Sequence, residues 1–186
     1  MRRVGRHPQP EIRERLLDAC TDHALAHGLP DRLEPLAKAA GTSSRMLIYH
    51  FGTRDGLLRE VLGRARARQV ETFEALLRPR PDEPYLATLR RAWSAISGTE
   101  GEPYFRLFMR LHDTAGEPLW PGFRRTATTD WLAPLEDGMR TLGRPELGTV
   151  VLAVIRGLLM DLTATGDVAR TDRAFDAFLA ALDDAA

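Results

Sequence analysis

The sequence has a single cysteine, no long apolar run and no secretory leader. These features argue against a disulfide-bonded, a membrane-spanning and a secreted protein, respectively. Cys20 has no second cysteine with which to pair, so an internal disulfide is excluded and a reducing compartment is expected. The longest unbroken apolar run, Val150–Ile155, ends at Arg156, far short of the roughly 20 residues that cross a membrane. The basic start, MRRVGRHPQP, lacks the apolar segment of a signal peptide. We therefore expect a cytoplasmic protein that has no membrane partner.

Sequence motifs of catalysis and of phosphate binding are also missing. The chain has no glycine-rich phosphate loop, no G-x-S-x-G sequence and no H-E-x-x-H sequence. His23 and His27 are spaced to share one helical face, but no third metal ligand accompanies them. We therefore expect neither an enzyme nor a metal site nor any other cofactor, and an all-α enzyme remains a minor alternative.

The net charge is zero, which by itself argues against a nucleic-acid partner, but the charges are unevenly distributed. Residues 1–78 carry 14 Lys and Arg against 10 Asp and Glu, whereas residues 79–186 carry 12 against 16. A basic head on an acidic body allows an electrostatic footprint for phosphate. The excess is small, so the charge pattern favours a DNA partner without establishing one.

Apolar residues recur at helical spacing in almost every segment, and no stretch of useful length alternates as a strand would. The fold class is therefore predicted to be all-α. Asp31 with Glu34 is a plausible capping pair for the second helix. Either Thr42 or Ser43 can cap the third helix, and Thr53 is a good N-cap for the fourth. The expected helices cover residues 12–27, 33–40, 43–51, 54–77, 86–96, 104–112, 118–142, 147–162 and 175–182.

A tight break at Gly41-Thr42 separates the short helices 33–40 and 43–51, which is the arrangement of a helix-turn-helix unit. Ser43 and Ser44 offer a helix cap and hydroxyl groups, and Arg45 could grip a guanine through two hydrogen bonds. The spacing alone leaves open a surface helical hairpin whose charges are incidental.

Three further side chains follow within ten residues. Tyr49 and His50 lie one helical turn beyond Arg45, where they could meet the DNA backbone. Arg54 begins the next helix, beside amide groups that are able to bind a phosphate. The N-terminal arginines Arg2, Arg3 and Arg6 could also reach DNA, or could belong to a solvated terminus.

The segments LLDACTDHALAHG and LAKAAGTSSRMLIYHFGTRDGLL resemble the tetracycline-repressor (TetR) family of transcriptional regulators, over roughly the first third of the chain. The resemblance implies a helix-turn-helix DNA-binding domain over residues 1–56 and a helical effector-binding and dimerisation domain over residues 57–186. The sequence departs from the family at Ile48, where a tyrosine is usual, and at Glu34, which would repel phosphate. The DNA contacts implied by the resemblance are Ser44, Arg45, Met46, Tyr49, His50 and Arg54.

In a regulator of this class the helical body forms a homodimer, and the last two helices are the candidates. Residues 150–162 are apolar over most of the helix circumference, and Gly157 would let a partner helix approach closely. The alternative is a central helix buried within one chain. The predicted interface consists of Val151, Val154, Ile155, Leu158, Leu162, Phe175, Phe178 and Leu182.

The body also contains an aromatic and methionine-rich set that suits an apolar, partly aromatic effector. Each member could instead be an ordinary core residue. The candidate ligand-binding residues are Trp93, Phe105, Phe108, Met109, His112 and Trp131.

These observations predict a homodimeric transcriptional repressor that a small apolar or aromatic effector releases from a double-stranded DNA operator. The alternative is a helical small-molecule-binding or protein-interaction module whose head no longer reads DNA, which Met46, Ile48 and Glu34 keep open. The sequence does not specify the operator, the effector, the regulated genes or the direction of regulation.

Overall fold

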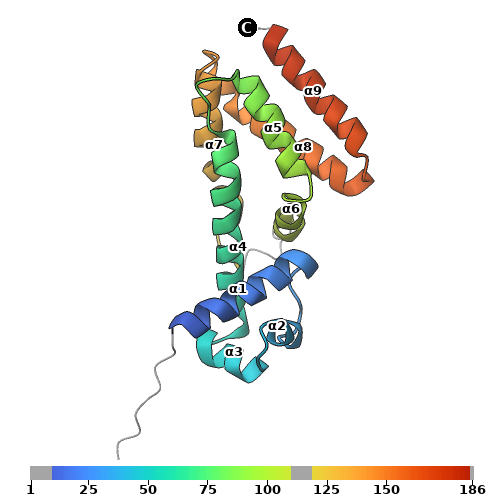
Figure 1. Ribbon diagram of the computed structural model, residues 1–186. Helices are drawn as coiled ribbons and strands as arrows, with labels where there is room; N and C mark the ends of the chain where they lie inside the picture. Colours follow the sequence, from blue (N-terminus) through green and yellow to red (C-terminus); the bar gives the residue numbers. More distant parts are fainter. Residues whose placement is uncertain (1–9, 110–118, 185–186) are drawn as a thin grey trace, which may run out of the picture.

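The structure, a computed structural model, describes residues 10–109 and 119–184 (Figure 1). Within these ranges it is helical and contains no strand, so the all-α prediction is confirmed. The helices are α1 Pro10–His27, α2 Glu34–Ala39, α3 Ser44–Phe51, α4 Arg54–Leu77, α5 Tyr85–Ser97, α6 Glu102–Met109, α7 Phe123–Arg140, a 3-10 turn Pro145–Leu147, α8 Gly148–Thr165 and α9 Val168–Asp184.

The molecule has a small head and a larger body, and the long helix α4 belongs to both. In Figure 1, α1, α2 and α3 lie at one end, α5, α7, α8 and α9 lie at the other, and α6 lies between them above α1. The first turns of α4 are in the head core, where Leu57, Leu58 and Val61 are buried with residues of α1, α2 and α3. Its last turn, at Leu77, packs in the body core. A single continuous helix therefore connects the two ends of the chain.

Two short polar caps set the starts of α3 and α4, as the sequence predicts. The Ser43 hydroxyl accepts a hydrogen bond from the amide of Met46 at 3.3 Å, and the Thr53 hydroxyl accepts one from the amide of Gly56 at 2.9 Å. Each bond satisfies an amide that has no partner inside its own helix. Between α2 and α3 the chain turns at Gly41, whose φ of +63° is a conformation that glycine adopts without strain.

The start of α2 differs from its prediction. Leu33 occupies the N-cap position and no side chain bonds there, so the expected pairing of Asp31 with Glu34 is wrong. Pro35 lies in the first turn of α2, where its missing amide hydrogen costs no helical hydrogen bond. The short helix α2 is held by the burial of Leu36 and Ala37 in the head core.

The bounds of α7 also differ from the predicted 118–142. The helix begins at Phe123, directly after Gly122, whose φ is +77°, and it continues through Pro134 to Arg140. The expected end of the sixth helix, at residues 111–112, lies outside the described residues, as do Arg2, Arg3 and Arg6.

Helix α8, with the 3-10 turn before it, is long and apolar enough to cross a membrane by length and composition alone, over Pro145–Thr165. The count of uninterrupted apolar residues in the sequence did not anticipate this. One side of α8 lies in the body core through Val151, Leu152 and Ile155, packed against α7 and α9. That placement is the one expected of a core helix.

Candidate DNA interface and effector cavity

Helix α3 presents one open face at the end of the molecule that is remote from α9 (Figure 1). Leu47 and Phe51 are buried and anchor the helix to the head core. Arg45 is exposed beside Met46 and Tyr49, whose exposed fractions are 41% and 53%. Within the described residues Arg45 makes no hydrogen bond or ion pair. Its guanidinium is therefore free to contact a ligand.

The other predicted DNA contacts are placed less simply. Ser43 acts as the helix cap, and Ser44 is half-buried. Half-buried His50 lies edge-to-face against the ring of Tyr49, with 5.1 Å between ring centroids. The guanidinium of Arg54 donates to the carbonyl of Pro30 at 3.1 Å and to the Asp55 carboxylate at 3.2 Å. Arg54 is therefore engaged within the protein, and its charge is partly compensated.

Arg13, on α1, holds the recognition helix in place, and the sequence analysis did not identify it. Its guanidinium lies 4.8 Å from the centroid of the Phe51 ring and donates to the backbone oxygen of His50 at 3.4 Å. It also binds both carboxylate oxygens of Glu60 at 2.5 Å. One side chain therefore connects α1, α3 and α4.

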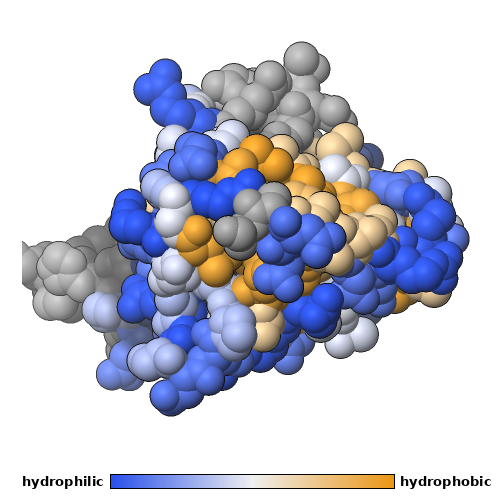
Figure 2. Space-filling model, turned by 90° about the horizontal axis from the view of Figure 1, so that it is seen from above, coloured by the Kyte–Doolittle hydropathy of each residue, from blue (hydrophilic) through white to orange (hydrophobic). Residues whose placement is uncertain are grey.

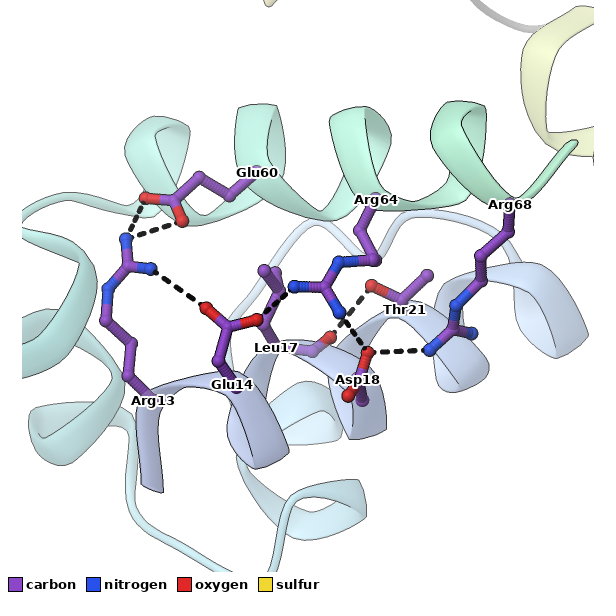
Figure 3. Close-up of polar contacts among 8 residues, drawn as sticks. All are labelled: Arg13, Glu14, Leu17, Asp18, Thr21, Glu60, Arg64 and Arg68. Atoms are coloured by element: carbon purple, nitrogen blue, oxygen red, sulfur yellow. Dashed lines mark hydrogen bonds and ion pairs between the residues drawn. The ribbon is translucent and has the colours of Figure 1, made fainter. Parts of the chain in front are cut away.

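The Arg13–Glu60 pair is the first step of an ionic ladder that runs along the α1–α4 contact (Figure 3). Arg64 binds Glu14 and also Asp18, the latter at 2.7 Å. Arg68 binds the same Asp18 at 2.7 Å and Asp22 at 2.6 Å. Exposed pairs contribute only about 0–1 kcal/mol each, so the ladder acts chiefly by fixing the register of the two helices.

On each side of the ladder, charged residues recur every four positions, and this spacing is visible in the sequence. Glu14, Asp18 and Asp22 repeat on α1, and Glu60, Arg64 and Arg68 repeat on α4. This spacing places each set on one helix face. The repeat was the signal that could have revealed a pairing of α1 with α4, although not its register.

A second link joins the head to α6. Arg106 donates to the backbone oxygens of Leu25 and Ala26, at 3.1 and 3.0 Å, and pairs with Glu102 at 2.8 Å. The carbonyl groups at the end of a helix lack intrahelical partners and carry partial negative charge. A cation there stabilises the end of α1 and ties it to α6.

The body contains a cavity of about 110 Å³ between α4, α6, α7 and α8. Four of the predicted ligand-binding residues line it: Phe105, Phe108, Met109 and Trp131. The prediction for Trp93 is wrong, because its ring stacks on Phe175 in the body core at 4.8 Å and its indole N–H donates to Asp172. His112 lies outside the described residues.

The remaining lining was not predicted, and within the described parts of the chain it includes three polar side chains. Arg66, Gln69 and Arg156 reach it from α4 and α8. Arg66 and Gln69 are three residues apart on α4, so they lie on one face of the helix. Only the packing of the helices shows that this face lines the cavity. The other lining residues are Phe73, Leu77, Ile96, Gly101, Ala127, Leu135, Leu152, Ile155 and Leu159.

The predicted dimer residues divide into two groups. Val151, Ile155, Phe175 and Leu182 are buried in the body core, so their assignment to an interface is wrong. The physical reason is that they form the inner faces of α8 and α9. Val154, Leu158, Leu162 and Phe178 are half-buried and remain available at the edge of the core.

The outer face of α8 carries apolar and small side chains that the monomer leaves open. Val150 and Met160 are 43% and 55% exposed, and Ala153 and Gly157 lie between them on the same face. Figure 2 shows that apolar surface also gathers on the side of the body seen from above, bordered by hydrophilic residues. Exposed apolar patches of this kind mark interaction sites.

Helix α1 carries a histidine pair and a cysteine, and neither is arranged for metal binding or nucleophilic reactivity in the part of the chain that the structure describes. The rings of His23 and His27 lie 4.7 Å apart, but the described residues contain no group of three or more side chains able to hold a metal. Cys20 is fully buried and its Sγ lies 3.9 Å from the backbone oxygen of Leu36. Burial raises the pKa of this thiol to about 11, so it is protonated and unreactive at neutral pH.

No protein-family model and no curated protein matches the sequence. Among solved structures, a transcriptional regulator from Rhodococcus sp. RHA1 is 21% identical with a TM-score of 0.70, covering 90% of this chain and 94% of that one. A TetR transcriptional regulator from Streptomyces coelicolor is 22% identical with a TM-score of 0.60, covering 91% and 97%. SmeT, the repressor of a Stenotrophomonas maltophilia multidrug efflux pump, is 20% identical with a TM-score of 0.61, covering 91% and 89%. Over nearly its whole length, the chain has the fold of the TetR transcriptional regulators.

Proposed function

We propose that the protein is a ligand-responsive, DNA-binding transcriptional regulator, a cytoplasmic repressor that a small effector releases from its operator. The observation that carries this proposal is the exposed helix α3, held on a head that shares helix α4 with a cavity-bearing body. The names of the similar structures support it, since they are transcriptional regulators and one is an efflux-pump repressor. A recognition helix inserts into the major groove and reads base edges from its N-terminal part.

Arg45 is the side chain best suited to reading a base. It is the second residue of α3, it is exposed, and no partner within the described residues holds it. Arg bidentate to guanine is the commonest specific contact in the major groove. Arg54 has its guanidinium bound to Pro30 and Asp55 and is better suited to support the head or to contact phosphate after rearrangement.

We expect Arg45→Ala to weaken operator binding by roughly 5–150-fold, corresponding to about 1–3 kcal/mol, while binding to random DNA changes much less. Arg54→Ala should weaken both kinds of DNA by a similar, smaller factor. The measurement is fluorescence anisotropy at two salt concentrations, with the DNA upstream of the protein's own reading frame, or a site selected from random DNA, as the operator.

Arg80→Ala, an exposed cation in the loop before α5, is the control and should leave both affinities unchanged. Equal losses on operator and random DNA for Arg45→Ala would remove Arg45 from the base-reading role. Failure to select any DNA sequence would favour the alternative module whose head has lost that role, for which the exposed apolar side chains Met46 and Ile48 are the supporting observation.

We propose further that the regulator acts as a dimer through the outer face of α8. Two heads related by a two-fold axis would read half-sites roughly 34–36 Å apart. An effector that prefers a different arrangement of the heads would shift this separation and weaken binding, by a coupling of about 1–3 kcal/mol.

The contacts of α4 and α6 support a direct route from the cavity to the heads. Arg66, Gln69 and Phe73 line the cavity from α4, and the same helix carries the ionic ladder to α1. Phe105 and Phe108 line the cavity from α6, and Arg106 on that helix binds the end of α1. An effector that moves either helix therefore acts on α1 through contacts one or two turns away.

Coupling between two sites is reciprocal, so operator DNA should alter α6 even without an effector. We expect operator binding to change amide hydrogen exchange in α6 as well as in α3, and we expect Arg106→Ala to abolish the α6 response while α3 remains protected. Arg140→Ala, which removes an exposed pair with Asp137 on α7, is the matched control. An α6 response that survives Arg106→Ala would place the coupling in α4 alone.

A further inference from the structure

The polar chemistry of the cavity is dominated by two guanidinium groups. Arg66 on α4 and Arg156 on α8 both line it, and Arg66 is 8% exposed. Burial, and then the charge of Arg66, lowers the pKa of Arg156. Among the described lining residues, Gln69 is the remaining polar side chain, and the others are apolar or aromatic.

Arg66 has a carboxylate among its partners. It donates to one oxygen of Asp130 from two nitrogens, at 2.8 and 3.3 Å, and to the amide oxygen of Gln69 at 2.6 Å. Its guanidinium also lies 4.8 Å from the centroid of the Trp131 ring. These contacts hold the group rigidly, and the Asp130 carboxylate compensates its charge.

The partners that Arg156 has among the described residues are neutral. It donates to the hydroxyl of Thr128 and to the backbone oxygen of Ala127, each at 3.0 Å. Within the described residues no carboxylate pairs with it. Among the described residues, the two guanidinium groups of the cavity wall are therefore balanced by one carboxylate, that of Asp130, which leaves a net charge of +1 beside apolar surface. A desolvated charge without a counter-ion is unfavourable, and an anionic ligand would offset that cost.

We propose that the effector is a small aromatic carboxylate, whose anionic group binds Arg156 while its ring fills the apolar part of the cavity. This inference rests on the proposed role of the cavity as the effector site. Guanidinium groups pair with carboxylates through two parallel hydrogen bonds, and both terminal nitrogens of Arg156 have hydrogen atoms beyond those it already donates. The rings of Phe105, Phe108 and Trp131 supply the aromatic wall. A cavity of about 110 Å³ suits a single ring with one small substituent.

A second role for Arg156 is to brace α7 against α8 through Ala127 and Thr128. Bracing predicts a loss of stability on substitution, with no preference for the charge of the ligand. Anion binding predicts a preference that follows the charge of the ligand and the charge balance of the wall. Three isosteric probes, benzoate, benzamide and benzamidinium, therefore separate the two roles.

The experiment is calorimetric titration of the full-length protein, without DNA, with each of the three probes. We expect benzoate to bind at least about ten-fold more tightly than benzamide, and benzamidinium to bind more weakly still. Arg156→Gln should remove the preference for benzoate, because it weakens benzoate binding much more than benzamide binding, whereas Arg140→Gln, on the surface of α7, should change neither. Equal binding of the three probes, preference for benzamidinium, or no binding of any probe would overturn the proposal.

Asp130→Asn provides a second variant, for which the expected change in benzoate affinity is in the opposite direction. It removes the carboxylate that compensates Arg66, so benzoate affinity should rise several-fold. Should Arg156→Gln fail to fold, this variant decides the question, and unchanged or weaker benzoate binding would contradict the proposal. Because these titrations use no DNA, they also separate the two proposals. Benzoate that binds as expected without weakening operator binding would leave the ligand class standing and would count against the cavity as the effector site.

Discussion

Gly157→Arg should leave the protein folded but monomeric, and should weaken binding to a two-half-site operator by roughly 10²–10⁴-fold. A side chain at Gly157 meets open space, since an added Cβ would find nothing within 4 Å. Replacing glycine inside a helix also removes a cost of about 1 kcal/mol. The monomer therefore tolerates the change, whereas a partner helix lying against Ala153 and Gly157 would meet a long cation in an apolar contact.

The operator effect follows from bivalency, because a monomer binds one half-site and loses the effective concentration that tethering supplies. Sedimentation velocity would give the oligomeric state, and anisotropy with full and half operators would give the affinities. Ala75→Arg introduces the same side chain at an exposed position of α4 and should leave the dimer intact. A Gly157→Arg protein that stays dimeric would place the interface away from the outer face of α8.

Gly138→Ala is expected to cost about 2–4 kcal/mol of the free energy of unfolding. A Cβ at this position of α7 would lie 1.8 Å from Cζ of Tyr85 and 2.2 Å from its hydroxyl oxygen. Tyr85 is 3% exposed and begins α5, so its ring is enclosed by protein and can move only by displacing buried neighbours. The glycine therefore leaves room for the Tyr85 ring against α7, and even one methyl group would displace that ring.

Thermal unfolding would show the effect as a fall in Tm of roughly 5–15 °C for a chain of this length. Gly63→Ala is the matched control, because an added Cβ on that α4 residue meets nothing within 4 Å and should stabilise the helix slightly. The double variant Gly138→Ala with Tyr85→Leu should lose less free energy of unfolding than the two single variants lose together, because the ring that clashes is gone. A Gly138→Ala protein as stable as the parent would refute the tight packing of the Tyr85 ring on Gly138.

The helix bounds of the head were predictable from the sequence because their signals are local. Ser43 and Thr53 each cap a helix through an amide three residues later, and Gly41 turns the chain between α2 and α3. The start of α2 was not predictable in the same way. Asp31 and Glu34 have the residue types of a capping pair, but Leu33 took the cap position and packed against the head core.

A candidate site was predictable where its residues lie close together on one helix, and not where it depends on how helices pack. Arg45, Met46 and Tyr49 belong to one short amphipathic helix, and its buried residues Leu47 and Phe51 decide which face is open. The dimer residues failed because α8 is apolar around most of its circumference. A pattern of that kind cannot distinguish the side that packs on α7 and α9 from the side left for a partner, and Val151 and Ile155 proved to be on the inner side.

The sequence by itself determined the all-α class, the helix-turn-helix of the head and the continuous helix from Arg54 to Leu77, since caps, turns and helical periodicity act within a few residues of chain. Only the tertiary structure decided which charges meet. Arg13 and Glu60 are 47 residues apart, and Arg66 and Asp130 are 64 apart. It also decided that Arg156 faces the cavity with neutral partners, and that Trp93 belongs to the core. Contacts of this kind depend on how helices far apart in the sequence pack against one another. A repeat along one helix indicates which residues share a face, but it does not indicate which helix packs on that face.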